Sequence, residues 1–205
     1  MSNQGENLKI IIVVWNRLDH TMKTINSLLR TVPKAKLFIY DNASTEKGLY
    51  PYYETLLDSK ITIGNKNVGW GKAVNEAYED VTCYDDDYIL LSNNDVEYSD
   101  GWYDKAIALY EKYPKIGVLG LWKHKNHGVM QDYGDLVTKD QMPGTCWLMK
   151  PAVLKDIGTF VEHGPCLTKG GNGEDVDYCL RADKKDYWVA GPKEDLAIHL
   201  DGYEN

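Results

Sequence analysis

Apolar, β-branched runs alternate along the chain with segments in which apolar residues recur every three to four positions. The run LKIIIVV at 8–14 is continuous, a pattern typical of a parallel strand that is buried on both faces. The segment after it carries Met22, Ile25, Leu28 and Leu29 at helical spacing. The same alternation predicts strands at 35–40, 60–64, 88–91 and 116–120, and helices at 69–79 and 100–113. Such alternation predicts right-handed βαβ units and a mainly parallel sheet.

The pattern becomes irregular beyond about residue 120. Residues 128–150 are expected to form strand and loop, and 169–183 a glycine-rich loop that leads into a helix. The tail, YWVAG…LAIHL, supplies two short strands. Because neither an internal repeat nor a linker divides the chain, we predict an α/β fold in one domain over 1–205. Its first half is Rossmann-like, and its second half is α+β.

Composition and charge exclude several classes of protein. The 205 residues suffice for a hydrophobic core that needs no disulfide or metal as a staple. A net charge of −8 means that no Lys/Arg excess attracts phosphate backbones, so nucleic acid is not expected as a partner. No cleavable signal opens the chain, and no run approaches the ~18 apolar residues that span a membrane. Four scattered cysteines without zinc-site spacing complete the expectation of a cytoplasmic protein with free thiols: Cys83, Cys146, Cys166 and Cys179.

Polar clusters follow four of the predicted strands at their carboxyl ends. In open α/β sheets ligands bind at this edge, near the point where the strand order reverses. The four clusters are Trp15-Asn16-Arg17, Asp41-Asn42, residues 65–71 and Asn93-Asn94-Asp95. A fifth cluster, the DDD triplet at 85–87, precedes its strand and belongs to the opposite edge, about 13 Å away. We interpret this triplet as a solvated turn and Asn93-x-Asp95 as the functional cluster.

The clusters and their flanking strands belong to a series of seven segments. The first four are IIVVWNR, FIYDNAST, NKNVGWGKAVNEA and YILLSNNDVE, and the last three are GTCWLMKPAVLKDIGTF, GGNGEDVDYCLR and AIHLDG. In order and spacing, the series resembles the inverting family-2 glycosyltransferases with the GT-A fold. The resemblance implies a nucleotide-binding half (1–120) and an acceptor-binding, catalytic-base half (121–205). It also implies transfer of a sugar from a UDP- or dTDP-linked donor to an acceptor hydroxyl, with a glycan as the expected acceptor.

The resemblance implies a donor site along the carboxyl edge of the sheet. Asp41 would accept a hydrogen bond from an imino N–H of uracil or thymine; the alternative is that it only ends its strand as an Asx-turn residue. Gly69 and Gly71 would let the backbone approach the ligand closely, and Lys72 could reach a phosphate. The other positions implied for donor binding are Trp15 and Asn16, beside the base, and Arg17, Asn67, Asn93 and Asn94.

The triplet at 93–95 matches the family's metal-binding motif. Asp95 would bind a divalent cation that bridges the two phosphates and stabilises the leaving nucleotide diphosphate. Asn93 stands where the family usually has an acidic residue, and its amide keeps an oxygen ligand without the charge. His199, at the end of the last strand, matches the family's C-terminal metal ligand and is expected to compensate. One imidazole beside oxygen ligands fits Mn²⁺ at least as well as Mg²⁺, so either cation is the expected cofactor.

The segment GGNGEDVDYCLR at 170–181 matches the family's catalytic-base segment. Inversion requires a carboxylate that takes the acceptor's proton while the acceptor oxygen attacks in line, opposite the leaving phosphate. By the motif, Asp175 is the base and Glu174 positions the acceptor; the alternative is that both only cap the helix. Gly171 and Trp147 are implied at the acceptor site, although core packing is a comparable alternative for the tryptophan.

Other functions remain compatible with these residues. A glycosyltransferase could act on modified DNA, although the acidic charge argues against this. A glycan- or nucleotide-binding module could keep the fold without turnover; Asn93 favours that reading, and the intact Glu174-Asp175 pair opposes it. A nucleotidyltransferase could share the fold but would not require the GED segment.

Overall fold

The structure, a computed structural model, describes residues 5–122, 128–162 and 173–201. The helices are α1 (Leu18–Thr31), α2 (Leu49–Tyr53), α3 (Trp70–Tyr78), α4 (Trp102–Lys112), α5 (Pro151–Ile157) and α6 (Glu174–Lys184). The strands are β1 (Leu8–Val14), β2 (Lys36–Asp41), β3 (Lys60–Ile63), β4 (Tyr88–Asn93), β5 (Val96–Tyr98), β6 (Ile116–Gly120), β7 (Val129–Asp132), β8 (Leu136–Lys139), β9 (Cys146–Met149), β10 (Trp188–Pro192) and β11 (Ala197–His199). The strands and helices expected over the first half of the chain are all present. Among the helices described, none combines the length and apolar character that a membrane crossing requires.

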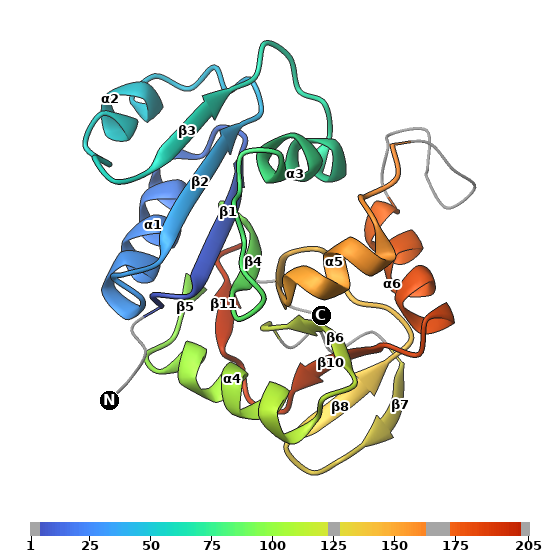
Figure 1. The fold of residues 1–205 in the computed structure, drawn as a ribbon. Coiled ribbons are helices and arrows are strands. Elements are labelled where there is room, and N and C mark those ends of the chain that lie inside the picture. The colour runs from blue at the N-terminus through green and yellow to red at the C-terminus, as the bar shows by residue number, and fades with distance from the viewer. Residues whose placement is uncertain (1–4, 123–127, 163–172, 202–205) are drawn as a thin grey trace.

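Nine strands form one sheet in the order β3-β2-β1-β4-β9-β6-β10-β8-β7 (Figure 1). The first four strands of this order are parallel, and β6 and β10 also pair in parallel. The chain runs outward from β1 to β2 and β3 and then places β4 on the other side of β1. The strand order therefore reverses between β1 and β4, which is where open α/β sheets bind ligands. The prediction of an α/β fold with a largely parallel sheet flanked by helices is confirmed.

Antiparallel strands complete the far half of the sheet. β9 lies between β4 and β6, and β8 and β7 follow one another beyond β10. A separate antiparallel pair joins β5 to β11. The tail forms two short strands, β10 and β11, as predicted. The sequence pattern does not predict α2, β5 or α5, because elements of five, three and seven residues are too short to show a clear period.

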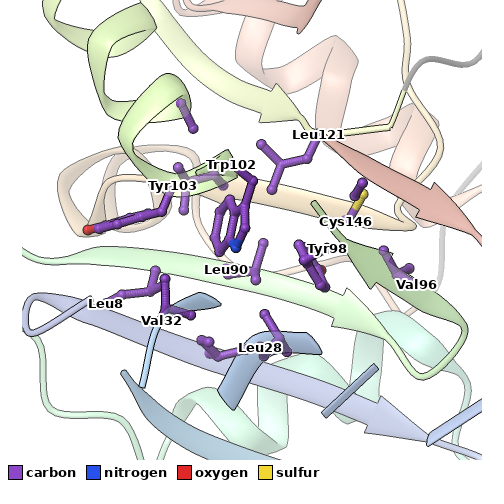
Figure 2. Packing of buried hydrophobic residues seen from close by; sticks show 14 of the residues in the cluster. Leu8, Leu28, Val32, Leu90, Val96, Tyr98, Trp102, Tyr103, Leu121 and Cys146 are labelled. Atoms are coloured by element: carbon purple, nitrogen blue, oxygen red, sulfur yellow. The ribbon is translucent and has the colours of Figure 1, made fainter. Parts of the chain in front are cut away.

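Alternate residues of β1 enter two hydrophobic clusters, one on each face of the sheet. The even-numbered residues of β1 belong to the cluster that includes residues of α1 and α4. Ile11 and Val13 belong to the cluster that includes residues of α3, α5 and α6. Figure 2 shows the first cluster, in which Trp102 of α4, Leu90 of β4 and Tyr98 of β5 converge. Burial on both faces explains why β1 is apolar from Ile10 to Val14.

The acidic triplet at 85–87 lies at the amino edge of the sheet, as predicted, but it is not solvated throughout. Its first two residues are exposed, whereas Asp87 is buried. Lys9 Nζ donates to Asp87 Oδ1 at 2.9 Å, and the N–H of Tyr84 donates to Asp87 Oδ2 at 2.8 Å. The prediction was wrong for Asp87 because Lys9, at the start of β1, supplies the counter-charge that a buried carboxylate requires.

Three of the four cysteines lie within the described residues. Cys83, Cys146 and Cys179 are free thiols, as expected. Cys166 lies outside the residues that the structure describes.

Candidate active site

A cavity of about 370 Å³ lies where the carboxyl end of β4 meets the start of α6. Its lining residues are Trp70, Asn93, Pro143, Gly144, Thr145, Gly173, Glu174 and Asp175. Three of them are residues that the sequence singles out: Asn93 from the triplet after β4, and Glu174 and Asp175 from the GED segment. The fold therefore brings two predicted clusters, far apart in the chain, to one cavity.

Both carboxylate oxygens of Asp175 accept hydrogen bonds from backbone N–H groups. Gly144 donates to Oδ2 at 3.3 Å, and Val176 donates to Oδ1 at 2.8 Å. The bond from Gly144 joins the start of α6 to the loop before β9. The carboxylate is thus held at the cavity wall by two separate elements, and fixed placement of this kind is what a general base requires.

Glu174 has a less satisfied carboxyl group than Asp175. Its Oε2 is buried and accepts no hydrogen bond from the part of the chain that the structure describes. Burial raises the pKa of Glu174 above its ordinary value, and the nearby charge of Asp175 raises it further. One carboxyl oxygen of this cavity-lining residue is therefore buried without a partner among the described residues.

Glycines on two elements allow α6 to start at this place. Gly173, just before the helix, has a φ of 112°, which other residues adopt only with strain. A Cβ added to Gly71 of α3 would lie 3.0 Å from Glu174 Cγ and 3.1 Å from Phe160 Cβ. Gly71 was expected to let the backbone approach the ligand closely, but the structure gives this glycine a different role. Its missing side chain makes room for Glu174.

A second polar group lies at the same sheet edge, beside the reversal point between β1 and β4. Asp95 follows β4, and the antiparallel pairing of β11 with β5 places His199 opposite Val96. His199 Nε2 is 3.6 Å from Asp95 Oδ1. Together with Asp201, these residues place three ligand atoms within 4.8 Å of one another. Sequence reasoning found Asp95 and His199 but missed Asp201, which stands in the same AIHLDG segment.

The donor set of this Asp95–His199–Asp201 cluster fits a divalent cation. Asp95 is buried, and none of the described residues donates a hydrogen bond to its Oδ1. A buried oxygen in that state is costly unless a cation or a water satisfies it. Two carboxylates and one imidazole are ligands that suit Mn²⁺ and, less selectively, Mg²⁺. The amide Oδ1 of Asn93 is also buried without a hydrogen bond from the described chain.

Arg17 supplies a positive charge to this cluster. Its Nη1 donates to Asp95 Oδ2 at 2.9 Å, and its Nη2 donates to Asp201 Oδ1. His20 Nε2 lies 3.3 Å from the same oxygen of Asp201. The hydrogen bond from Arg17 lowers the pKa of Asp201 below its ordinary value. Arg17, predicted to bind the donor, therefore contacts the two carboxylates of the candidate metal centre.

Asn16 and Asn94 shape the turn after β1. Asn16 Oδ1 accepts hydrogen bonds from two backbone N–H groups of the loop after β2, at 2.8 and 3.1 Å. Asn94 Nδ2 donates to the carbonyl of Asn16 at 2.8 Å and to Thr21 Oγ1 at 2.9 Å. Asn16 and Arg17 have φ values of 56° and 65°, a region that residues other than glycine adopt only when the surroundings enforce it. The two asparagines thus help to hold the backbone from which Arg17 projects.

Asp41 is fully buried, with both carboxylate oxygens occupied. Its Oδ1 accepts a hydrogen bond from the N–H of Ser44 at 2.6 Å, and its Oδ2 accepts one from the Tyr53 hydroxyl at 2.7 Å. The first bond spans three residues, one more than an Asx-turn, and fixes the turn that follows β2. Because Asp41 is 0% exposed, a contact with a base would require the surrounding residues to move.

The loop before α3 is held by Asn42. Asn42 Nδ2 donates to Asn67 Oδ1 at 3.1 Å and to the carbonyl of Gly69 at 3.3 Å, and its Oδ1 accepts from the N–H of Val68 at 2.8 Å. Gly69 has a φ of 86°, which accounts for glycine at this position. Asn67 and Gly69 therefore give the loop its shape.

Two further residues predicted to bind the donor have accessible side chains. Trp15, directly after β1, is 55% exposed, so its ring is free to stack on a flat ligand. Lys72 Nζ pairs with Glu162 at 2.8 Å and lies 3.8 Å from Glu76. A phosphate that binds Lys72 would therefore compete with Glu162 for its ammonium group.

The family model described as glycosyl transferase family 2 matches residues 9–163. The chain belongs to this family. No curated protein sequence matches the chain. The family-2 match includes the triplet at 93–95 but ends before α6 and β11. The position of Glu174, Asp175 and His199 beside that triplet is therefore a separate observation, which comes from the structure.

Three solved structures that share the fold of this family-2 chain are GT-A glycosyltransferases. A crystal structure of GalNAc-T7 with UDP, GalNAc and Mn²⁺ has a TM-score of 0.75 at 12% identity, and the match covers 94% of this chain and 43% of that one. The mannosyltransferase PcManGT from Pyrobaculum calidifontis, in complex with GDP-Man and Mn²⁺, has a TM-score of 0.73 at 13% identity, with coverages of 97% and 58%. S. aureus TarS has a TM-score of 0.69 at 18% identity, with coverages of 93% and 36%. The chain thus spans 36–58% of the length of these three.

Trp147, which the family resemblance implied at the acceptor site, lies in the core. Trp147 is 0% exposed, and its ring packs against Trp70, Phe160 and Tyr178 at centroid distances of 6.2, 6.1 and 5.8 Å. Core packing, the alternative for Trp147, is what the structure shows. Trp70 lines the cavity instead, and sequence reasoning missed it although it directly follows Gly69 at the start of a helix. Gly171 lies outside the described residues.

Proposed function

We propose that this family-2 protein is a metal-dependent, inverting glycosyltransferase that moves a sugar from a UDP- or dTDP-linked donor to a hydroxyl of a glycan. The observation that carries the proposal is the single cavity of about 370 Å³ lined by Asn93, Glu174 and Asp175. Sugar transfer requires the donor's anomeric carbon, the acceptor hydroxyl and a base in one place. Similar structures that contain UDP or GDP-Man with Mn²⁺ support the donor class.

Asp175 is the proposed general base. Its carboxylate, held by the N–H of Gly144, takes the acceptor proton while the acceptor oxygen forms a bond to the anomeric carbon. The bond from that carbon to the leaving phosphate breaks on the opposite side, so the configuration inverts. Glu174, with its buried Oε2, accepts a hydrogen bond from the acceptor and orients it.

Asp95, His199 and Asp201 are the proposed ligands of Mn²⁺ or Mg²⁺, with the amide of Asn93 as a further oxygen. The cation would supply positive charge that stabilises the leaving nucleotide diphosphate. The exposed ring of Trp15 is proposed to stack on the base of the donor.

Calorimetry tests the donor and metal parts of the proposal. UDP and dTDP are titrated into the protein with and without Mn²⁺, and into an Asp95→Ala variant. We expect Mn²⁺-dependent binding of at least one nucleotide, and a loss of about tenfold or more in the variant, because a ligand that bears charge is removed. Asp85→Ala is the matched control, because Asp85 is an exposed aspartate at the opposite edge of the sheet. Absence of nucleotide binding, or Mn²⁺-dependent binding unchanged in Asp95→Ala, would contradict the proposal.

Turnover tests the role of Asp175 and separates an enzyme from a binding module. Release of nucleotide diphosphate is followed with a panel of UDP- and dTDP-sugars, with and without glycan acceptors. Asp175→Asn should lower turnover by about 10²–10⁴-fold while donor binding persists. Asp183→Asn, an exposed change near the end of the same helix, should leave turnover unchanged. A wild-type protein that binds the donor yet shows no turnover on any acceptor would favour the binding module.

A further inference from the structure

Arg17 holds the same two carboxylates that the proposed metal centre would use. Nη1 bonds to Asp95 and Nη2 to Asp201, so one guanidinium bridges residues from the β4–β5 turn and the end of the chain after β11. With one positive charge, Arg17 offsets part of the repulsion between two carboxylates that lie side by side. A divalent cation would satisfy the same oxygens with a larger charge.

The backbone of Arg17 is fixed, whereas its side chain has room to move. The N–H groups of Arg17 and Leu18 both donate to Glu46 Oε2, which satisfies two donors at the start of α1. The side chain of Arg17 is 34% exposed, and that of Asp201 is 46% exposed. Rotation about the side-chain bonds of Arg17 can therefore move the guanidinium off the carboxylates without a change in the backbone.

We propose that Arg17 is an internal counter-cation of the Asp95–His199–Asp201 cluster. A divalent cation must displace its guanidinium from the two carboxylates, and a nucleotide diphosphate then binds the displaced guanidinium. The inference rests on the proposed function, because it takes the cluster as the metal centre. Guanidinium groups bind carboxylates and phosphates with the same forked geometry, so a diphosphate offers Arg17 a replacement for the bonds that it loses. The metal alone then competes with Arg17 for the two carboxylates. When the nucleotide is also present, its diphosphate binds Arg17 and the competition ends.

This exchange predicts positive coupling between metal and nucleotide, part of which depends on Arg17. Coupling of this kind is reciprocal: the factor by which UDP tightens Mn²⁺ binding equals the factor by which Mn²⁺ tightens UDP binding. Removal of the guanidinium charge should tighten binding of the metal alone and reduce the factor by which the nucleotide tightens metal binding.

Electron paramagnetic resonance of free Mn²⁺ measures this coupling directly, without turnover. Mn²⁺ is titrated with and without saturating UDP into the wild type, Arg17→Gln and Arg17→Lys. In Arg17→Gln we expect Mn²⁺ alone to bind about three- to tenfold tighter than in the wild type, which is the range for a partly exposed, charged pair of bonds. The enhancement of Mn²⁺ binding by UDP should fall by at least the same factor. Arg17→Lys keeps the charge but loses the forked geometry. Its Mn²⁺ affinity and its enhancement by UDP should lie between those of the wild type and those of Arg17→Gln. Arg30→Gln is the matched control, because Arg30 lies on α1, the helix that Arg17 precedes, and it also pairs with an aspartate, Asp100.

Thermal unfolding supplies a second readout and a check on folding. Metal-free Arg17→Gln should unfold at a lower temperature than the wild type, and Mn²⁺ should raise its unfolding temperature by more than it does for the wild type. Should Arg17→Gln fail to fold, the comparison of Arg17→Lys with the wild type carries the same test.

The outcomes distinguish the inference from the function on which it rests. Mn²⁺ affinity and UDP enhancement that are unchanged in Arg17→Gln, or metal binding that becomes weaker, would overturn the counter-cation role and leave the metal centre intact. No binding of Mn²⁺ to the wild type in either condition would instead overturn the metal centre, and the inference with it.

Discussion

Replacement of Gly71 by alanine is expected to lower turnover about tenfold while it lowers the free energy of unfolding by no more than about 2 kcal/mol. The new Cβ would lie 3.0 Å from Glu174 Cγ and 3.1 Å from Phe160 Cβ, whereas carbon atoms pack best at about 3.5–4.0 Å. The start of α6 must therefore shift by roughly 0.5 Å. Because a displacement of 1 Å at a reacting centre costs about 10²-fold, a shift of this size should lower turnover about tenfold.

The effect on stability is a difference between two opposing contributions. Alanine is more favourable than glycine in a helix by about 1 kcal/mol, whereas overpacking costs about 1–3 kcal/mol. The free energy of unfolding should thus fall by about 0–2 kcal/mol, which in a chain of 205 residues lowers the unfolding temperature by at most about 8 °C.

Turnover under saturating donor, measured well below the unfolding transition, separates the two effects. Gly128→Ala is the control, since the nearest atom to its new Cβ is 3.9 Å away. Turnover of Gly71→Ala equal to that of the wild type, at any unfolding temperature, would show that the position of Glu174 relative to α3 does not matter to the reaction. The link between this packing and catalysis would then be wrong.

Three other changes test the structure. Asp87→Asn should lower the free energy of unfolding in urea by about 3 kcal/mol, because it leaves the buried ammonium of Lys9 without its carboxylate; a loss below about 0.5 kcal/mol would show that the pair is effectively solvated. Tyr53→Phe should cost about 1–2 kcal/mol in thermal unfolding, because it removes the bond to Asp41 Oδ2, and no loss would mean that water replaces the hydroxyl. Glu174→Gln should stabilise the protein at pH 7, because the folded state raises the pKa of Glu174 and disfavours its ionised form. The gain should vanish below the ordinary pKa of 4.5, so urea unfolding with an equal effect at pH 4 and pH 7 would contradict it.

Much of the first half of the fold can be predicted from local pattern. A strand buried on both faces is mostly apolar, so the segments of β1, β2 and β4 are visible as largely apolar runs. A polar group directly after such a run has to lie at the carboxyl edge of a parallel sheet. The same logic placed the DDD triplet at the opposite edge, but it could not show that Asp87 turns inward to meet Lys9.

The candidate site was only partly predictable, for a physical reason. Local pattern shows which residues end a strand or begin a helix, and it identified Asn93 and Asp95 as candidates. His199 and Asp175 were implied by the family resemblance. Local pattern does not show which distant segments meet. Trp70 became a lining residue, and Asp201 a member of the metal cluster, only through the packing of whole elements against one another.

The sequence by itself therefore determined the kind of fold, the edge of the sheet at which its polar residues gather, and the residue types that chemistry there would use. These features follow from period and order along the chain, which every segment carries locally. Only the tertiary structure decided that Asn93 shares a cavity with Glu174 and Asp175, that Trp147 lies in the core, and that Arg17 bridges two carboxylates. Those outcomes depend on the pairing of β5 with β11 and on the insertion of β9 beside β4. Such pairings are selected by the burial and hydrogen bonding of the folded chain as a whole, and no local period encodes them.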